Sequence, residues 1–153
     1  MPQVLQETSV KLLLIIADEM EKCLQITEDQ WLERSAPGKW SRKEILGHLI
    51  DSAANNHLRF VRAQFADTDF ITIAYEQNHF VASQYYQGSN IGDLLTLWQS
   101  YNRHLAHVIR HINASKLDIM CHIGDYQPVP LSFVVTDYVT HLDHHLAQIF
   151  NKG

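Results

Sequence analysis

The chain has 153 residues, of which 46% are hydrophobic and 19% are charged, and its formal net charge is -5. This length and mixture predict one globular domain over residues 1–153 and exclude an intrinsically disordered chain. The acidic balance without a long basic run argues against nucleic acid as a partner, and no apolar run is long enough to cross a bilayer.

A helical period of apolar residues over residues 5–26 predicts a first long helix. The apolar positions expected to share its inner face are Val10, Leu13, Leu14, Ala17, Met20 and Leu24. Residues 27–39 contain Pro37 and Gly38 and predict a connection, with one short turn at residues 28–33.

The start of the second helix is marked by Ser41 and Glu44, which form a Ser-x-x-Glu capping box. The helical period then continues to about Gln64. One flank of this helix, next to the apolar face, carries polar residues at steps of three and four: His48, Ser52, Asn55 and Arg59. Asp51 points away from that flank and is expected to face solvent or to pair elsewhere.

Residues 65–89 form a long connection that is rich in aromatic and aliphatic residues. We expect it to pack over the core and to include a short helix at residues 78–86, and long ordered connections are often functional. Asn90 is a plausible cap for a third helix that extends to residue 112. Because this helix is rich in aromatic residues, it is the candidate for a dimer interface.

Residues 114–130 predict a loop or an irregular hairpin, and a fourth helix begins at Leu131 or Ser132 and extends to residue 150. Four amphipathic helices without alternating strands predict an all-α fold, a four-helix bundle. The two long connections allow a topology other than simple up-and-down.

The N-terminus lacks the basic start and the hydrophobic segment of a secretory signal, so we expect a cytoplasmic protein. The chain has two cysteines, too few for a disulfide framework or a thiolate zinc site. In a reducing compartment both are expected as free thiols, Cys23 as a small buried residue and Cys121 in a loop.

Ten histidines are the unusual feature of the composition. On the fourth helix, His141 and His145 lie four residues apart on one face, as in helical metal sites, whereas His144 is turned away and is expected at the surface. A third ligand must come from a neighbouring helix. His48 fits if the second and fourth helices run antiparallel, because the early part of one then meets the late part of the other.

Other histidines compete with this assignment. His57 lies further along the second helix, and the third helix carries a second set at steps of three and four, here called the histidine ladder: His104, His107 and His111. The ladder is interpreted either as a polar helix face or as a separate metal site. The pair on the fourth helix could also be core histidines with satisfied nitrogens.

Two segments of the chain together resemble a known family. Residues 39–52 read Lys-Trp-Ser-Arg-Lys-Glu-Ile-Leu-Gly-His-Leu-Ile-Asp-Ser and are followed by Asn55, Asn56, Arg59 and Phe60. Residues 138–149 read Tyr-x-x-His-x-x-His-His-Leu-Ala-Gln-Ile. The pattern resembles the DinB/YfiT-like superfamily, in particular its YfiT branch of metal-dependent hydrolases, which is related to bacillithiol S-transferases.

This resemblance implies a four-helix bundle with a long crossover connection, commonly a homodimer. It implies a zinc or nickel ion held by one histidine of the first segment and two of the second, here His48, His141 and His145. Asn55 and Arg59 resemble the positions that follow the first ligand, and the resemblance makes them substrate-binding candidates. The competing interpretation is that both are packing residues of the helix, with an ion pair for the arginine.

A divalent metal with an open position favours the anionic form of a bound thiol or water. The expected function is therefore a thiol S-transferase, in which a low-molecular-weight thiol attacks an electrophilic small molecule and Arg59 binds a carboxylate of the thiol. The aromatic connection is expected to shape the pocket. The alternatives are a hydrolase that activates water, and a non-catalytic metal-binding or structural bundle.

A hydrolase needs a general acid or base near the metal, and the sequence offers no obvious inward carboxylate. Glu44 points off the apolar stripe and Asp143 lies opposite it, which favours the transferase. Loop residues such as Glu76 or Asp125 are the remaining candidates for that role.

Overall fold

Four long helices form the body of the protein in the computed structural model, which describes residues 2–150. They are α1 (Gln3–Cys23), α3 (Arg42–Ala63), α5 (Ile91–Arg110) and α6 (Leu131–Phe150). The connecting elements are α2 (Glu28–Leu32), β1 (Asp69–Thr72), α4 (Gln77–Gln84), η1 (Tyr86–Gly88), η2 (Ala114–Lys116), β2 (Met120–Ile123) and β3 (Val129–Pro130). Every predicted helix is present, including the short ones. No helix in residues 2–150 is long and apolar enough to cross a membrane.

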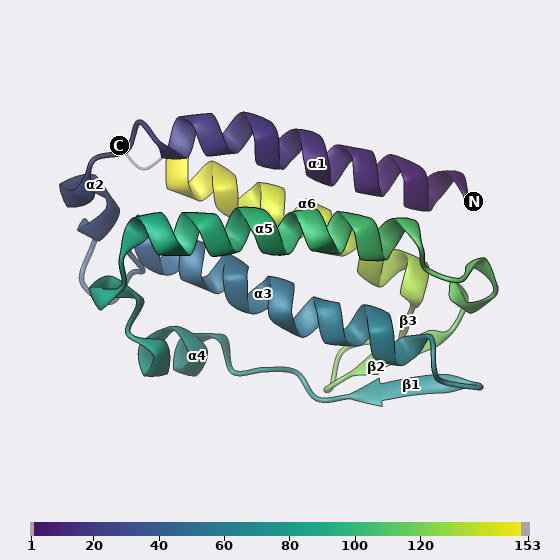
Figure 1. Cartoon of the computed structure of the whole chain (residues 1–153). Helices are drawn as coiled ribbons and strands as arrows, with labels where there is room; N and C mark the ends of the chain where they lie inside the picture. The colour runs from purple at the N-terminus through teal and green to yellow at the C-terminus, as the bar shows by residue number, and fades with distance from the viewer. Residues whose placement is uncertain (1, 151–153) are drawn as a thin grey trace.

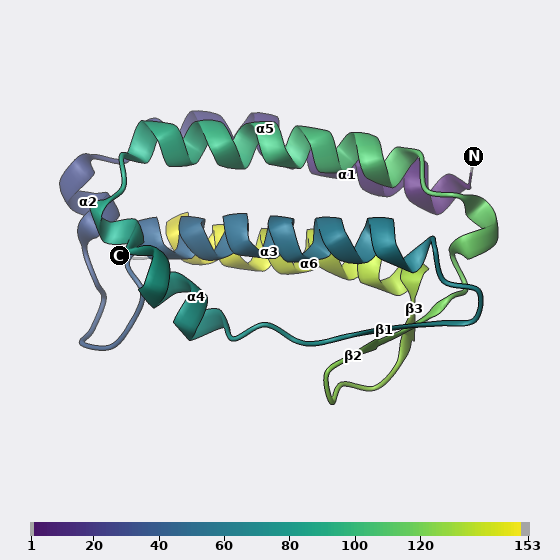
Figure 2. The ribbon, with the colours of Figure 1, turned by 60° about the horizontal axis from the view of Figure 1, so that its bottom comes forward.

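The four long helices pack as a bundle in which α1 and α3 lie on diagonal corners. Each of these two packs against both α5 and α6. Figures 1 and 2 show that α3 and α5 run in the same direction, whereas α1 and α6 run in the opposite one. The reason is the long connection through β1 and α4, which carries the chain back along the outside of the bundle. The predicted four-helix bundle with a crossover connection is confirmed.

A small sheet closes the end of the bundle where α3 ends and α6 begins (Figure 2). Its strands are ordered β1-β2-β3, with β1 parallel to β2 and β2 antiparallel to β3. The pairing of β2 with β3 is the irregular hairpin that the sequence predicted. The pairing of β1 with β2 was not predicted, because it joins short segments that lie far apart in the sequence.

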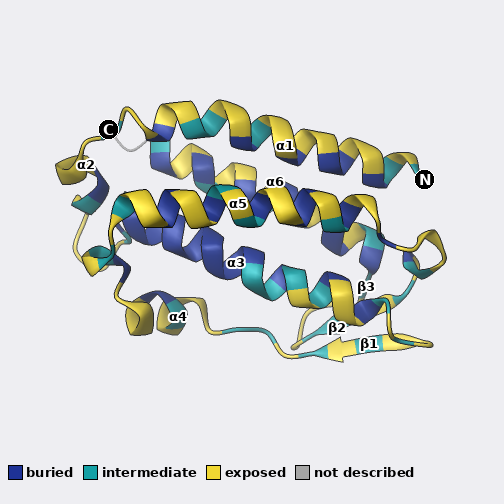
Figure 3. Cartoon of the chain, viewed as in Figure 1, coloured by how far each residue is buried: buried dark blue, intermediate teal, exposed yellow. Residues whose placement is uncertain are grey.

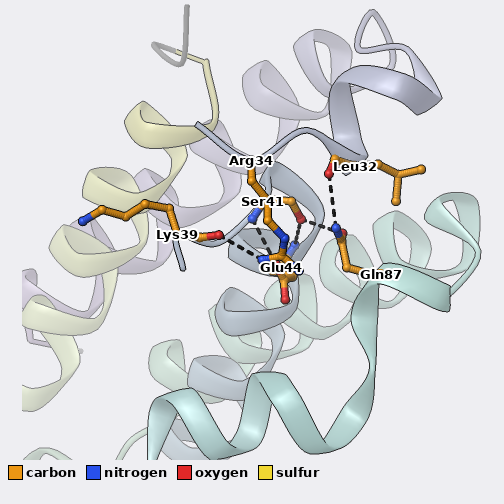
Figure 4. A network of polar contacts seen from close by, with 6 residues as sticks. All are labelled: Leu32, Arg34, Lys39, Ser41, Glu44 and Gln87. Carbon is orange, nitrogen blue, oxygen red and sulfur yellow. Dashed lines mark hydrogen bonds and ion pairs between the residues drawn. The ribbon is translucent and has the colours of Figure 1, made fainter. Parts of the chain in front are cut away.

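The start of α3 is held by a network of polar contacts (Figure 4). The Oγ of Ser41 accepts a hydrogen bond from the amide of Glu44 at 3.1 Å, and the Ser41 amide donates to Glu44 Oε1 at 3.0 Å. Arg34 forms an ion pair with the same carboxylate. Ser41 Oγ donates to Gln87, whose amide donates to the carbonyl of Leu32. The predicted capping box is confirmed, and it fixes where α3 begins, ahead of the first predicted metal ligand.

The first half of α3 is buried on every side (Figure 3). All residues from Lys43 to Ala53 are buried, because α5 and α6 cover two faces and α2, α4 and η1 cover the others. Aromatic and aliphatic side chains of all the long helices and of α2 fill the centre. The largest fully buried side chains are Trp31, Trp98, Phe60, Leu5, Leu12, Ile16, Ile45, Leu46, Leu49, Leu105, Ile109 and Leu131.

The predicted inner face of α1 is wrong. Its buried residues are Leu5, Thr8, Ser9, Leu12, Ile16 and Cys23. Five of the six residues expected inside are exposed instead: Val10, Leu13, Leu14, Ala17 and Leu24. The middle of this helix carries apolar residues around most of its circumference, so the period predicted a helix without selecting the face that meets the core.

The aromatic face of α5 is also turned inward. Trp98 is fully buried, and Tyr101 lies half-buried against His57, with 5.6 Å between the ring centroids. The burial of Trp98 shows that this ring packs in the core, and the dimer interface on α5 stays a prediction. The homodimer itself stays a prediction.

Both cysteines are free and buried. Cys23 occupies the core, as predicted, but Cys121 lies on β2 rather than in a loop. Burial raises the pKa of Cys23 to about 12 and that of Cys121 to about 11. Neither thiol is therefore activated as a nucleophile.

Candidate metal centre

Three histidines from two helices converge inside the bundle. His48 lies near the start of α3, and His141 and His145 lie in the second half of α6. Because α3 and α6 are antiparallel neighbours, these positions meet at the same level (Figure 1). One ligand atom from each ring lies within 4.8 Å of the other two. We call this group the histidine triad.

The two rings from α6 are oriented by hydrogen bonds. His141 Nε2 and His145 Nε2 face each other at 3.0 Å, and His145 Nδ1 lies 2.9 Å from Gln148 Oε1. Since an amide oxygen can only accept, His145 donates through Nδ1 and keeps its Nε2 lone pair for the centre of the triad. The ring of His48 completes the group, with its centroid 5.4 Å from His141 and 4.7 Å from His145.

His48 is fully buried, and neither of its ring nitrogens has a hydrogen-bond partner. Trp40 packs against its ring at 4.9 Å between centroids and offers no acceptor. Burial first, and then the two neighbouring imidazoles, lower the pKa of His48 to about 3. A buried polar group without a partner is unfavourable, and a cation at the centre of the triad would satisfy it.

The chemistry of the donor set fits a divalent cation. Burial lowers the pKa of both His141 and His145, so all three imidazoles are neutral near pH 7, as metal ligands must be. Two imidazole nitrogens on one tetrahedral zinc ion lie about 3.3 Å apart. The 3.0 Å separation of the two Nε2 atoms on α6 is close to that spacing. Imidazole suits zinc and nickel alike.

The competing histidines do not converge in this way. His144 is exposed, as predicted, and so are all three histidines of the ladder. His57 contacts the hydroxyl of Tyr101 through Nδ1 at 2.9 Å. Within residues 2–150, the triad is the one group of at least three histidine, cysteine or carboxylate side chains whose ligand atoms gather closely enough for a metal.

A cavity of about 570 Å³ is lined at one end by His141. Its walls come from α3, from the connection before α4, from the β2–β3 hairpin and from α6. Side chains that line it include Ser52, Asn56, Tyr75, Tyr126, Phe133 and Tyr138. From the long connection, Ala74, Tyr75 and Gln77 line the cavity, and its role in a substrate pocket stays a prediction. A ligand in this cavity would meet the triad from the His141 side.

The two substrate-binding candidates have different positions. Arg59 lines the cavity. Asn55 is not among the lining residues, and its amide donates to the carbonyl of Asp51. Its neighbour Asn56 lines the cavity instead. Along α3, steps of four, four and three from His48 lead to Ser52, Asn56 and Arg59, so the lining positions follow one helix face.

One carboxylate lies in the cavity wall, and the sequence interpretation missed it. Asp137 lines the cavity together with His141, one helical turn further on, and its charge opposes the burial that lowers the pKa of His141. The four-residue spacing between them was the available signal. Glu76 and Asp125 are not among the lining residues.

The other carboxylates are occupied or exposed. Glu44 is held by the capping box and by Arg34, and Asp143 is exposed. Asp51 does not face solvent. It is buried, with hydrogen bonds from Tyr86 at 2.6 Å and Gln84 at 2.7 Å, so only the alternative expectation, pairing elsewhere, is confirmed.

The family model of the DinB superfamily matches residues 14–149, which include the whole triad. The chain belongs to the DinB superfamily. The resemblance found in the two sequence segments is thus confirmed. No curated protein matches the chain.

Two solved structures share the fold of this DinB-superfamily chain. One is YfiT from Bacillus subtilis, described as a probable metal-dependent hydrolase with an unusual four-helix bundle topology. It is 18% identical in sequence and superposes with a TM-score of 0.83, over 99% of this chain and 87% of YfiT. The mycothiol-dependent maleylpyruvate isomerase is 15% identical, with a TM-score of 0.76 over 97% of this chain and 61% of the isomerase. At these identities the likeness establishes the fold.

Two residues that support the triad in this DinB-superfamily chain were not singled out from the sequence. Trp40 covers the ring of His48, and Gln148 orients the ring of His145. Gln148 lies three residues after His145 on α6, a spacing at which helical side chains meet. Trp40 lies outside any helix, and no spacing rule predicts its contact.

Proposed function

We propose that this chain is a metal-dependent thiol S-transferase, in which His48, His141 and His145 hold a zinc or nickel ion. The observation that carries the proposal is the convergence of three imidazoles, one of them buried without any partner, at the end of a cavity. A divalent cation held there would favour the anionic form of a bound thiol or water and so supply the nucleophile.

The protein's own residues bind, orient and exclude water. His48 and Trp40 close the inner side of the centre, and Gln148 keeps His145 in the tautomer whose Nε2 is free. His141 borders the cavity, so a small molecule in that space would lie beside a metal ion held by the triad. Three histidine ligands with one position left for a small molecule are typical of catalytic rather than structural zinc sites, which supports an enzymatic role.

The cavity supports a small-molecule substrate pair. Arg59 is the cationic side chain in its wall and is proposed to bind an anionic group. Asn55 does not line the cavity, and its part in substrate binding stays a prediction. One structural neighbour is a mycothiol-dependent maleylpyruvate isomerase, and its name includes a thiol cofactor. This likeness supports thiol chemistry on this fold. We therefore propose a low-molecular-weight thiol and an electrophilic small molecule as the two reactants.

A hydrolase is the second candidate, and Asp137 favours it. Its carboxylate lies in the same cavity wall as His141, where it could accept a proton from water at the open position. YfiT is itself described as a probable metal-dependent hydrolase. Asp137 is exposed and would equally accept the proton of a thiol, so it does not exclude the transferase.

One preparation separates the candidates. The purified protein is analysed for bound metal, loaded with zinc or nickel, and assayed with a panel of thiols and a chloro-dinitroarene, and separately with ester and amide substrates. Thiol-dependent loss of the arene supports the transferase. Turnover of esters or amides without thiol supports the hydrolase. Failure to bind metal stoichiometrically would leave a non-catalytic helical bundle.

A further inference from the structure

Arg59 is a half-buried cation with no carboxylate partner. Within residues 2–150, its guanidinium contacts Asn56 Oδ1 at 3.5 Å and the ring of Tyr75, 5.9 Å from the ring centroid. Neither contact compensates a full charge. Burial lowers the pKa of Arg59, which means that the site disfavours the charge it carries. A bound anion would stabilise the charged form of Arg59, and a guanidinium binds a carboxylate through two parallel hydrogen bonds.

The distance from Arg59 to the triad sets a length for the ligand. Arg59 follows His48 by eleven positions on α3, which is about 16 Å along a straight helix. The guanidinium contacts Asn56, one turn nearer to the triad, so the gap between guanidinium and triad is on the order of 10 Å. The cavity lies between these two points, bounded on the α6 side by Phe133 at one end and His141 at the other.

Charge and polarity differ along the cavity. Asp137 lies near His141, and Arg59 provides the positive charge at the far end. Between them the wall is largely aromatic and aliphatic, with Tyr75, Tyr126 and Val129 among its residues. In the metal-free protein, these charges therefore favour a negative group beside Arg59 over one beside Asp137. An apolar segment suits the space between.

We propose that the cavity binds an elongated organic carboxylate whose acid group pairs with Arg59, whose middle is apolar, and whose opposite end reaches the triad on the order of 10 Å away. The assignment of the opposite end as the reacting end rests on the proposed function. The carboxylate pocket itself does not, because Arg59 and the apolar walls are present without a metal.

The first experiment measures the carboxylate pocket alone, in metal-free protein. Calorimetry compares a series of ω-phenylalkanoates with the matching ω-phenylalkanols. The wild type should prefer the acids by about 10- to 100-fold, the range for a hydrogen bond to a charged group. Arg59→Met should lose that preference and keep its affinity for the alcohols, whereas Arg59→Lys should retain part of it. Arg62→Met, at an exposed arginine on the same helix, is the matched control.

The second experiment measures the length, in cobalt-loaded protein. ω-Mercaptoalkanoic acids of increasing chain length are titrated, and the thiolate-to-cobalt absorption band reports sulfur binding. Affinity should pass through a maximum at an intermediate length in the wild type and in Arg62→Met. In Arg59→Met the maximum should disappear. Mercaptoalkanes without the acid should bind both variants equally.

The outcomes separate the two proposals. Equal affinity of the wild type for acids and alcohols, or no binding of either, overturns the carboxylate pocket. A preference that survives in Arg59→Met overturns the role of Arg59. If cobalt and thiols bind but affinity has no maximum with chain length, the elongated ligand is contradicted and the metal site is not. If cobalt does not bind, the metal site is contradicted, and the carboxylate pocket is tested by the first experiment alone.

A turnover assay then identifies which reactant carries the carboxylate. One neutral thiol is combined with a chloro-dinitroarene and with its carboxylated counterpart, and one neutral arene is combined with neutral and carboxylated thiols. If the electrophile is the acid, Arg59→Met raises KM only for the carboxylated arene. If the thiol is the acid, the KM increase follows the thiol. An unchanged KM for every carboxylated reactant contradicts the pocket's role in turnover.

Discussion

Two groups of histidines on this protein have the same local spacing and different surroundings. His141 and His145 lie four residues apart on α6, with 4.4 Å between ring centroids, and His107 and His111 lie four apart at the end of α5, with 4.3 Å between theirs. The first pair is half-buried and meets a third imidazole, whereas the second pair is exposed. Helical spacing brings two rings together in both places, but it does not by itself make a metal site.

The facing helix makes the difference. On α3, His48 reaches the pair on α6 with both nitrogens free of hydrogen bonds. The ladder also has a histidine on α3 nearby, since the His57 ring lies 5.3 Å from that of His104, but His57 Nδ1 already contacts Tyr101. A third donor that is buried and unpartnered distinguishes the candidate metal centre from the polar face of α5.

The largest expected effect comes from removing the buried donor. His48→Ala should abolish stoichiometric zinc or nickel binding, with affinity falling by more than about 100-fold, beyond the range for outer-shell changes. Chelator competition and metal analysis measure it. His107→Ala in the ladder is the matched control and should bind metal like the wild type. Full occupancy in the His48 variant would mean that another residue is the third ligand.

The metal-free protein should be acid-labile because of the triad. The folded pKa of His48 is about 3, whereas an unfolded histidine has about 6.5, so below pH 6.5 only the unfolded chain gains the proton. Stability should fall by about 1.4 kcal/mol per pH unit from 6.5 toward 3, and by about 2–3 kcal/mol at pH 4.5. Urea unfolding in the presence of a chelator measures this loss.

The control for acid lability again uses the two histidine groups. His48→Leu should remove this part of the pH dependence, so that the unfolding free energy of the wild type decreases relative to that of the variant as the pH falls. His107→Leu should leave the wild-type dependence unchanged. Parallel pH profiles for the wild type and His48→Leu would contradict a neutral, buried imidazole at this position.

A smaller effect is expected for the residue that orients His145. Gln148→Ala should weaken metal affinity by about 10- to 100-fold, the usual effect of removing the hydrogen-bond partner of a metal-binding histidine. The fold should be unchanged, because Gln148 is exposed. His144→Ala, at the exposed neighbouring histidine, should have little effect. If Gln148→Ala binds metal with wild-type affinity, the hydrogen bond to His145 does not set the tautomer.

The smallest effect is expected for the N-terminal caps of α3 and α5, two of the helices that carry histidines. Ser41 caps α3, and Asn90 caps α5 by accepting a hydrogen bond from the amide of Asp93 at 3.0 Å. Ser41→Ala and Asn90→Ala should each lower the unfolding free energy by about 1 kcal/mol. Only Ser41→Ala should also reduce metal affinity, by less than about tenfold, because it loosens the helix start ahead of His48. Equal metal affinity in both variants would show that the cap serves stability alone.

Local signals predicted the helices and their starts well. The capping residues, the breaks at Pro37 and Gly38 and the apolar period each act within a few residues of chain, so they can be interpreted directly. The same holds for the pair His141 and His145, whose spacing alone places two imidazoles on one helix face. Combined with the family resemblance, the sequence also indicated His48 as the third member.

What needed the tertiary structure were the contacts between distant segments. The period of α1 could not select its buried face, because apolar residues surround its middle, and only packing against α5 and α6 decided that Leu12 and Ile16 lie inside. Likewise the pairing of β1 with β2, the burial of Asp51 and the presence of Asp137 beside His141 depend on which segments meet across the bundle.

The sequence by itself determined a helical bundle and three histidines suited to one metal, because helix geometry and capping are local. The tertiary structure decided which histidines are deprived of water and which are not, because burial depends on the neighbours of a helix and not on its own residues. It also decided that the cavity joins the His141 side of the triad to an unpaired arginine, since that space exists only where α3, α6 and the β2–β3 hairpin meet.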